Sequence, residues 1–354
     1  MNFYQKIISN QSLNFIDSIE ITHLKTPCQV NVSISNQRIP DSFDSIDFNS
    51  SLSGDKLTIK FKRPVNYLHF KIEINGVLTQ SLLNPILNYL ILEDDQQLVE
   101  HLSKSNLSIL GCARNCSTNL KSQLEFLRKI GENFASVNII IFENDSIDDT
   151  FDILNDFKSR GLIELYSVKG LDSILPLRTQ RLSYARNLLK SKINYSTTDY
   201  VIVADLDGVI DPFMDIQVIL DNFKYRNCWD VVFPVNKNKY YDIWALRHKS
   251  IMPFDYEREM NKFVFNFPEI TVLDFYLNRV NKMEFNKMRG WLSVESAFGG
   301  MGIYSSRYLQ WANYRGFDGV NQICEHVSLH ADIRREGGRL FINPNFVING
   351  VLNF

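Results

Sequence analysis

The chain contains the stretch Tyr200-Val-Ile-Val-Ala-Asp-Leu-Asp-Gly208, in which an apolar run leads directly into two carboxylates. A continuous apolar run is typical of a strand that is covered on both faces of a parallel sheet. Side chains alternate along a strand, so Asp205 and Asp207 project to one side while Leu206 points into the core. Two carboxylates this close repel each other unless a cation or a proton lies between them. The stretch therefore predicts a buried strand that ends at a cation site.

The segment before this stretch alternates apolar runs with amphipathic ones. The apolar runs predict strands at residues 107–113, 137–143, 162–168 and 200–207. The amphipathic runs between them predict helices, and the last of these helices covers residues 178–192. This alternation predicts an α/β fold with a Rossmann-like, mostly parallel sheet whose ligands bind at the carboxyl ends of the strands. Residues 229–354 are less regular, with a helix near 322–336, and we assign residues 106–354 to one large domain.

Residues 1–105 follow a different pattern, in which apolar and polar residues alternate. The alternation predicts strands at residues 29–35, 56–62 and 66–74, with turn signals between them. We therefore expect a small β-rich domain, built as a sandwich or a partial barrel. No charged cluster in this domain points to chemistry, so we expect an accessory module with a structural or oligomerisation role.

The composition excludes several classes of protein. The 354 residues carry a formal net charge of −2, so no overall field attracts nucleic acid or an anionic membrane surface. Five cysteines are scattered without a Cys-x-x-Cys pair, which is typical of reduced thiols in a cytoplasmic protein. The first residues lack the apolar run of a signal peptide, and no apolar stretch approaches the roughly 18 residues of a membrane span. We expect a cytoplasmic protein without a nucleic-acid partner or a transmembrane segment.

Two kinds of enzyme use a carboxylate pair at the end of a strand. Carboxylate oxygens are the ligands that Mg²⁺ and Mn²⁺ prefer, and these ions keep positions open for phosphate oxygens. The run Asp205-Leu-Asp-Gly-Val-Ile210 also resembles the first motif of haloacid-dehalogenase-like phosphatases, in which the first Asp is a nucleophile and the second a general acid. That family begins its fold with this strand, whereas here the strand is the fourth of the sheet. We also find no later acidic pair of the kind that the family requires, so the phosphatase is the weaker alternative.

Four stretches of the chain together give a more specific resemblance. They are Phe142–Thr150, Arg178–Asn187, Asp205–Asp207 and Tyr241–Arg247. They resemble the fungal capsule-associated α-1,3-mannosyltransferase family, and the similarity covers residues 107 to 350. The resemblance implies a GT-A glycosyltransferase with a DXD motif, which moves a sugar from a nucleotide-sugar donor to a glycan or other hydroxyl acceptor with Mn²⁺ or Mg²⁺. The donor sugar and the stereochemistry stay open, because the segment Cys324–His330 departs from the family pattern.

The resemblance implies that two loops of the predicted sheet hold the nucleotide. Ala113 and Arg114 follow the first strand, where the family binds the base and the ribose. Glu143 and Asp145 end the second strand and are implied to contact the base or the ribose. An ordinary turn between strand and helix is the alternative for the first loop, and a helix cap is the alternative for Asp145.

Arg178 and Arg181 begin the helix that precedes the strand of Asp205. The helix runs antiparallel to that strand, so its N-terminus lies at the carboxyl edge of the sheet. Both arginines fall on the helix face that carries Leu182 and Ala185, which must pack on the sheet. A diphosphate near a helix N-terminus suits both the arginine charge and the helix dipole. We predict that both arginines bind the donor diphosphate, with ion pairs to nearby Asp residues as the alternative.

Two later segments are predicted to bind the donor sugar or the acceptor. Asp242, Trp244 and Arg247 combine a carboxylate, an aromatic ring and a base. Carboxylates accept hydrogen bonds from sugar hydroxyls and aromatic faces stack on sugars, although core packing is the alternative for Trp244. Gly299 and Gly300 lack side chains, so we expect them to let the donor approach the backbone.

The last cluster is Cys324-Glu-His-Val-Ser-Leu-His330. His326 and His330 are four residues apart and share one face if the segment is helical. The segment does not match the His-Glu-x-x-His signature of zinc proteases. We predict that Glu325 and Asp242 are catalytic residues and that His330 or His326 is a third metal ligand. A capped helix with ordinary histidines is the alternative.

These residues combine into one predicted reaction. A Mn²⁺ or Mg²⁺ ion held by Asp205, Asp207 or both acts as a Lewis acid on the leaving nucleoside diphosphate, whose charge the two arginines share. Glu325 deprotonates the acceptor hydroxyl if the reaction inverts the anomeric centre, and Glu325 or Asp242 orients the substrates if it retains it. The β-rich domain lies outside the resemblance, so acceptor binding and homo-oligomer formation are both expected roles. A sugar-binding protein without catalytic activity is the second alternative.

Overall fold

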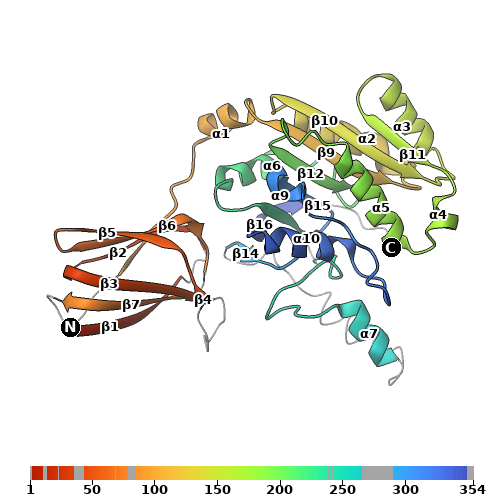
Figure 1. Cartoon of the computed structure of the whole chain (residues 1–354). Helices are drawn as coiled ribbons and strands as arrows, with labels where there is room; N and C mark the ends of the chain where they lie inside the picture. The colour runs from red at the N-terminus through yellow and green to blue at the C-terminus, as the bar shows by residue number, and fades with distance from the viewer. Residues whose placement is uncertain are drawn as a thin grey trace. The chain divides into compact units, whose positions relative to one another are not determined.

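The computed structural model describes residues 2–10, 14–22, 24–35, 44–67, 69–78, 85–237, 240, 242–264 and 290–348 (Figure 1). The chain divides into two compact units, Met1–Leu92 with Arg289–Trp291, and Glu93–Met288 with Leu292–Phe354. Helix α1 (Asp95–Leu102) belongs to the second unit. The division therefore precedes the boundary that we expected near residue 105.

The first unit consists of two four-stranded antiparallel sheets. One sheet has the order β1 (Asn2–Ser9), β7 (His69–Leu78), β3 (Leu24–Ser35) and β4 (Asp44–Ser45). The other has the order β5 (Phe48–Ser53), β6 (Lys56–Val65), β2 (Ile16–Ile21) and β8 (Ile86–Tyr89). One apolar core takes side chains from both sheets, among them Ile19, Ile59 and Ile72. Alternating strands with one buried face give a sandwich, which is one of the two forms that the sequence pattern allowed.

The second unit is built on one eight-stranded mixed sheet. The order is β11 (Glu164–Val168), β10 (Ser136–Asn144), β9 (Asn106–Ala113), β12 (Tyr200–Asp205), β15 (Met301–Ser305), β13 (Val231–Asn236), β16 (Leu340–Ile348) and β14 (Leu292–Ser293). Parallel pairings join β11 through β12 and also join β13 to β16, whereas β15 and β14 pair antiparallel with their neighbours. This confirms the predicted fold class, an α/β unit with a mainly parallel sheet that follows a β-rich unit.

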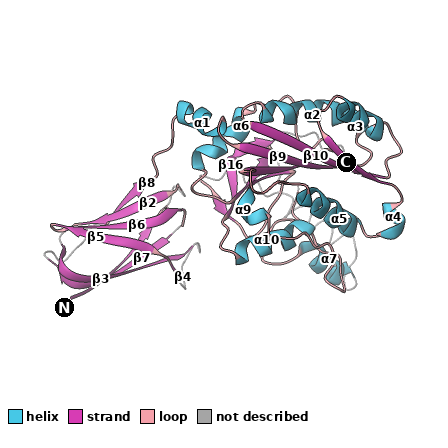
Figure 2. Ribbon diagram, turned by 45° about the horizontal axis from the view of Figure 1, so that its top comes forward, coloured by secondary structure: helices cyan, strands magenta, loops and turns pink. Residues whose placement is uncertain are grey.

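Helices cover both faces of this sheet. Helices α2 (Ser117–Gly131) and α3 (Thr150–Ser159) contact each other on one face, and α5 (Arg178–Ser191) and α10 (Glu325–Arg335) contact each other on the opposite face (Figure 2). The shorter elements are α4 (Leu171–Ile174), α6 (Gln217–Leu220), the 3-10 helix η1 (Asp221–Tyr225), α7 (Tyr256–Val264) and α9 (Ser306–Leu309). Within the described ranges, no helix has the length and apolar character needed to cross a membrane.

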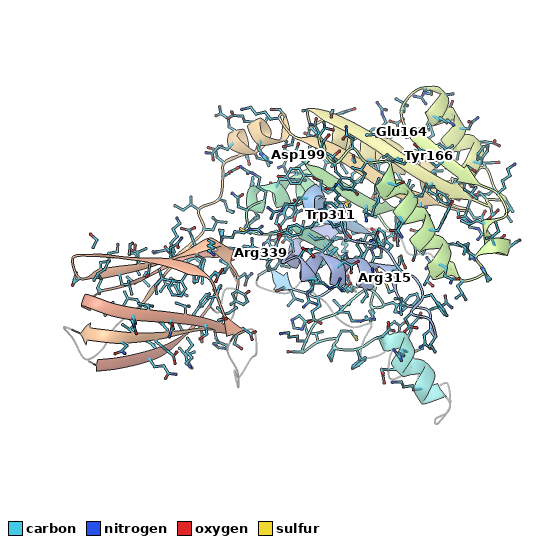
Figure 3. The ribbon with its side chains drawn as sticks, viewed as in Figure 1. Glu164, Tyr166, Asp199, Trp311, Arg315 and Arg339 are labelled. Carbon is cyan, nitrogen blue, oxygen red and sulfur yellow. The ribbon has the colours of Figure 1, made fainter. Side chains whose placement is uncertain are left out.

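Strand β12 lies in the middle of the sheet, between β9 and β15. Its register places Asp205 beside Cys112 and Ala204 beside Gly111. A side chain at Gly111 would meet Leu206 at 2.8 Å, so glycine there leaves room for the buried leucine that follows Asp205. At the sheet edge, by contrast, β11 carries polar side chains, and the Tyr166 hydroxyl donates to Glu164 at 3.1 Å (Figure 3). Asp205 and Asp207 therefore follow a strand in the covered centre of the sheet and not one at its polar edge.

Candidate active site

A cavity of about 380 Å³ lies at the carboxyl ends of β9, β10 and β12. Its walls come from those strand ends, the N-terminal turns of α5, the segment at residues 242–244 and the N-terminus of α10. Most of the site residues that we predicted line it. These are Ala113, Arg114, Arg178, Arg181, Asp205, Asp207, Asp242, Trp244, Glu325 and His326. Residues that are distant in sequence therefore meet at the edge where a doubly wound sheet binds its ligands.

The two carboxylates at the end of β12 have different surroundings. The Asp205 amide donates to the Gly300 carbonyl at 2.9 Å, and its carboxylate accepts from the Arg186 guanidinium at 3.2 Å. Asp207 is exposed and makes no hydrogen bond or ion pair with a described residue. Leu206 between them is buried, as the strand pattern predicted. Asp205 is thus held by the protein, whereas Asp207 faces the cavity with its charge uncompensated.

Arg178 and Arg181, which we call the outer arginines, lie at the start of α5 and line the cavity. Arg181 donates to the carbonyls of Leu175 and Pro176 at 2.7 and 2.8 Å, and neither contact neutralises its charge. Arg178 is exposed and makes no ion pair within the described part of the chain. The predicted orientation of α5 is correct, and the alternative of ion pairs to nearby Asp residues does not apply. Two cations without an acidic partner at a helix N-terminus form a site suited to an anion.

Arg186 lines the same cavity two helical turns further along α5, and our sequence reasoning missed it. Its guanidinium donates to Asp205 and, in a short contact, to Glu325 on α10. We call Asp205, Arg186 and Glu325 the inner triad. Arg186 and Glu325 are both buried, and pairing is what makes two buried charges tolerable. The available sequence signal was its position eight residues, or about two helical turns, after Arg178.

Asp242 lines the cavity without an ionic partner among the described residues. Its two carboxylate oxygens accept from the amides of Ala245 and Gly299, each at 3.3 Å. Burial raises the pKa of Asp242, and these backbone contacts only partly oppose that effect. A carboxyl group with a raised pKa in a cavity is a common arrangement for acid–base chemistry.

Two further groups in the cavity wall lack a hydrogen-bond partner among the residues that the structure describes. The indole nitrogen of Trp244 and Nδ1 of His326 are both buried and unpaired. His326 stacks on Phe298 with ring centroids 3.7 Å apart, and burial lowers its pKa well below the usual value, so the ring is neutral. Buried polar atoms are almost always satisfied, so these two groups suit contacts to a polar ligand. Core packing alone does not account for Trp244.

Glu143 and Asp145 do not line the cavity; Asn144 between them does. Glu143 is buried and accepts from the Ser146 amide at 2.9 Å and the Ser167 hydroxyl at 2.6 Å. Asp145 accepts from loop amides and from the Asn144 side chain at 3.0 Å. Both acids therefore hold the loops together, and the structure does not support the nucleotide contacts that we predicted for them. Asp145 does not cap α3, which begins after Asp149, but it accepts from the first amides of α4.

Arg247, Gly299 and Gly300 also lie outside the cavity wall. Arg247 donates to the Trp244 and Leu246 carbonyls and forms a short ion pair with Asp255, so it stabilises its own loop. Gly299 and Gly300 both have positive φ, at 70° and 98°. A side chain at Gly300 would meet Val209 at 2.5 Å. These glycines give the protein backbone its close approach to Asp205 and Asp242, and not the donor as we predicted.

His330 lies on the buried face of α10 and is fully enclosed. Its Nδ1 contacts the Ser296 hydroxyl at 2.8 Å, and its Nε2 contacts the Tyr304 hydroxyl at 3.0 Å. No ring nitrogen is left for a metal ion, so the prediction that His330 is a ligand is wrong. The helical spacing of His326 and His330 was right, but only His326 reaches the cavity.

Three cysteines also line the cavity: Cys112, Cys116 and Cys324. All the cysteines with described side chains are free. Burial raises the pKa of Cys112 to about 11 and that of Cys324 to about 12. They are therefore thiols and not thiolates near neutral pH, which disfavours a cysteine nucleophile.

No family model matches the chain, and no curated protein matches it. The resemblance to the fungal capsule-associated family therefore stays a prediction. Solved structures with a similar fold include residues 1–349 of TarS from S. aureus, with 11% identity over 69% of this chain and 60% of that one, and a TM-score of 0.38. They also include the mannosyltransferase PcManGT from Pyrobaculum calidifontis in complex with GDP-Man and Mn²⁺, with 11% identity over 70% of this chain and 57% of that one, and a TM-score of 0.43.

A third similar structure is glucosyl-3-phosphoglycerate synthase from Mycobacterium tuberculosis in complex with UDP. Its identity is 12% over 74% of this chain and 75% of that one, and the TM-score is 0.36. The chain thus spans less than two thirds of the first two structures. All three likenesses are distant and concern the fold, so the function proposed below is derived from the residues of the cavity.

Proposed function

We propose that the second unit is a GT-A glycosyltransferase that takes a nucleoside-diphosphate sugar as donor and a glycan or other hydroxyl compound as acceptor. The observation that carries the proposal is the pairing of opposite charges across one cavity. Among the described residues, the outer arginines have no acidic partners at the N-terminus of α5, and the Asp207 carboxylate at the end of β12 has no partner. A diphosphate binds the cations directly and approaches the carboxylate through a divalent cation.

The residues at the end of β12 fit a divalent cation of the Mg²⁺ or Mn²⁺ type. Asp207 has uncompensated charge, Asp205 is beside it, and the neutral ring of His326 has an unpaired nitrogen in the same cavity. The described residues contain no cluster of three or more candidate ligands, so water and phosphate oxygens would complete the coordination. When bound, the ion would act as a Lewis acid on the leaving diphosphate.

The remaining groups suit the sugar and the acceptor. The unpaired Trp244 nitrogen can donate to a sugar hydroxyl, and its ring can lie against a sugar face. Asp242 can take the proton of an acceptor hydroxyl, because it has no ionic partner among the described residues and burial raises its pKa. Ala113, Arg114 and Asn144 line the end of the cavity formed by β9 and β10, where we place the nucleoside. For the β-rich unit we propose an accessory role in acceptor binding or oligomerisation.

The phosphatase alternative fits the cavity less well. A nucleophilic Asp205 would need an unpaired carboxylate, yet its carboxylate forms an ion pair with the buried Arg186 guanidinium, which lowers its nucleophilicity. A non-catalytic sugar-binding protein has no need of two outer arginines and an acidic pair in one cavity. Both alternatives remain as outcomes of the following experiment.

The experiment incubates the protein with UDP-, GDP-, CMP- and dTDP-sugars, with and without Mn²⁺. The melting temperature is measured by thermal shift, and hydrolysis of the donor is measured as release of free nucleotide. We expect at least one nucleoside-diphosphate sugar to raise the melting temperature and to be hydrolysed slowly in the absence of an acceptor. Stabilisation by phosphorylated metabolites and by no nucleotide would favour the phosphatase. Stabilisation by free sugars alone would favour the binding protein.

A further inference from the structure

Arg186 joins three elements that are far apart in sequence. It lies on α5 and donates to Asp205 at the end of β12 and to Glu325 at the start of α10. The Arg186 and Glu325 side chains are only 8% and 5% exposed, whereas that of Asp205 is 23% exposed. Asp205 is therefore the member of the inner triad that a ligand in the cavity can reach most easily.

Two aromatic rings lie close to the Arg186 guanidinium. Its central carbon lies 5.3 Å from the Phe298 ring centroid and 5.9 Å from that of Tyr314. Cation–π contacts at these distances are attractive. A guanidinium is a rigid planar fork that can serve two carboxylates at once, whereas a lysine ammonium is a point charge on a flexible stem. The site is thus built for arginine in particular.

Glu325 and Asp242 differ in what their oxygens contact. Oε1 of Glu325 accepts from Arg186 and also lies 3.7 Å from Nε2 of the neutral His326. Within the part of the chain that the structure describes, Asp242 accepts only from two backbone amides, each at 3.3 Å. A carboxylate that holds a buried guanidinium in place cannot take a proton without leaving that guanidinium partly unpaired. Asp242 forms no ion pair with a described residue, so it can take up a proton without leaving another charge unpaired.

We propose that Arg186 is a positioning residue that fixes Asp205 at the cation site of the donor diphosphate, with Glu325 as its anchor and not as the catalytic base. This inference rests on the proposed glycosyltransferase function and revises the role that we predicted for Glu325 from the sequence. In the transfer, the acceptor oxygen forms a bond to the anomeric carbon as the bond from that carbon to the diphosphate oxygen breaks. The nucleoside diphosphate leaves with the electron pair, and the hydroxyl proton passes to Asp242.

The test compares kcat and donor KM for Glu325→Gln, Arg186→Lys, Arg186→Gln and Asp242→Asn with the donor found in the panel. A glutamine at position 325 keeps an oxygen that accepts from Arg186, so we expect kcat to stay within about tenfold of wild type. General-base catalysis contributes roughly 10²- to 10⁴-fold, so Asp242→Asn should lower kcat by that factor. Arg186→Gln should raise donor KM at least tenfold, and Arg186→Lys should recover only part of that loss.

Arg315→Gln is the matched control, because Arg315 (labelled in Figure 3) pairs with Asp332 of α10 at 2.7 Å and is not among the residues that line the cavity. We expect this variant to leave kcat and KM unchanged. A loss of kcat above a hundredfold in Glu325→Gln, with Asp242→Asn near wild type, would overturn the inference while leaving the glycosyltransferase intact. Donor KM unchanged in a folded Arg186→Gln variant would also overturn it. Failure of the wild-type chain to bind or turn over any donor would instead overturn the proposed function, and the inference with it.

Discussion

Helix α5 carries two kinds of arginine on the face that lines the cavity. The outer arginines, Arg178 and Arg181, have no acidic partner within the described part of the chain. Arg186 is buried between two carboxylates of the inner triad. The two kinds of arginine have different roles. An exposed charge without a partner can bind a ligand, whereas a buried and paired charge holds the elements of the protein together. Variants of the first kind should change binding alone, and variants of the second kind should also change stability.

The largest effect that we expect follows the removal of the free charge at Asp207. Asp207→Asn should lower the transfer rate about a thousandfold, or roughly 4 kcal/mol of transition-state stabilisation, because the cation and the diphosphate lose a carboxylate contact. The melting temperature should not change, since Asp207 is exposed and has no described partner. Activity is measured by nucleotide release. Full activity of the variant, or of the wild type in EDTA, would contradict the role of a metal ion.

The second effect concerns the inner triad. Arg186→Gln leaves the buried Glu325 without its ionic partner, which should lower the free energy of unfolding by about 3–5 kcal/mol. The control Arg315→Gln removes an ion pair whose arginine side chain is 47% exposed, and Asp332 keeps Arg335 as a partner, so the variant should cost less than about 1 kcal/mol. Urea denaturation measures both values. Equal losses in the two variants would remove the distinction between buried and exposed charge on which the comparison depends.

The third effect tests the buried histidine behind the triad. Burial lowers the pKa of His330 to about 3, so the folded protein keeps the ring neutral while the unfolded chain takes up a proton below the ordinary pKa of about 6.5. The unfolded state thus binds more protons between these values, and stability falls as pH falls from 6.5 towards 3. The expected slope is up to about 1.4 kcal/mol per pH unit.

Comparison with His330→Gln isolates this contribution. The wild type should lose more unfolding free energy than the variant as pH falls from 7 to 5, measured by urea denaturation at each pH. A difference between the two proteins that does not change with pH would show that His330 is not the titrating group.

The smallest effect lies at the nucleoside end of the cavity. Arg114 pairs with Asp172 at 3.0 Å, and both side chains are more than a third exposed. Arg114→Gln should therefore change the free energy of unfolding by less than about 1 kcal/mol. Donor affinity, measured by calorimetry, should fall only severalfold. A loss of donor affinity as large as that caused by replacing an outer arginine would indicate that the phosphates bind nearer to β9.

The sequence was sufficient to predict the fold and those residues of the candidate site that lie at the end of a strand or helix. Continuous apolar runs specify covered parallel strands, and the strand order then places the N-terminus of α5 beside Asp205. Arg178 and Asp207 could be predicted because each follows from its position at the end of one element. Local pattern and topology are enough for residues of that kind.

The rest of the site depends on contacts that no local pattern encodes. Arg186 and Glu325 are 139 residues apart, and their pairing requires α5 and α10 to lie on the same face of the sheet. His330 has the right spacing for a ligand, yet Ser296 and Tyr304 occupy both its nitrogens. Glu143 ends a strand at the expected edge, but its loop uses the carboxylate for its own hydrogen bonds.

The central claim is that the outer arginines bind the diphosphate of a nucleotide donor. Calorimetric titration of the wild type, Arg178→Gln/Arg181→Gln and the control Arg315→Gln with UDP and GDP in Mn²⁺ tests it most directly. Hydrogen bonds to charged groups contribute about 1.5–3 kcal/mol each, so the double variant should bind at least a hundredfold more weakly. The control should bind as the wild type does, and all three should melt at similar temperatures. Equal affinity in the double variant and the wild type would contradict the account.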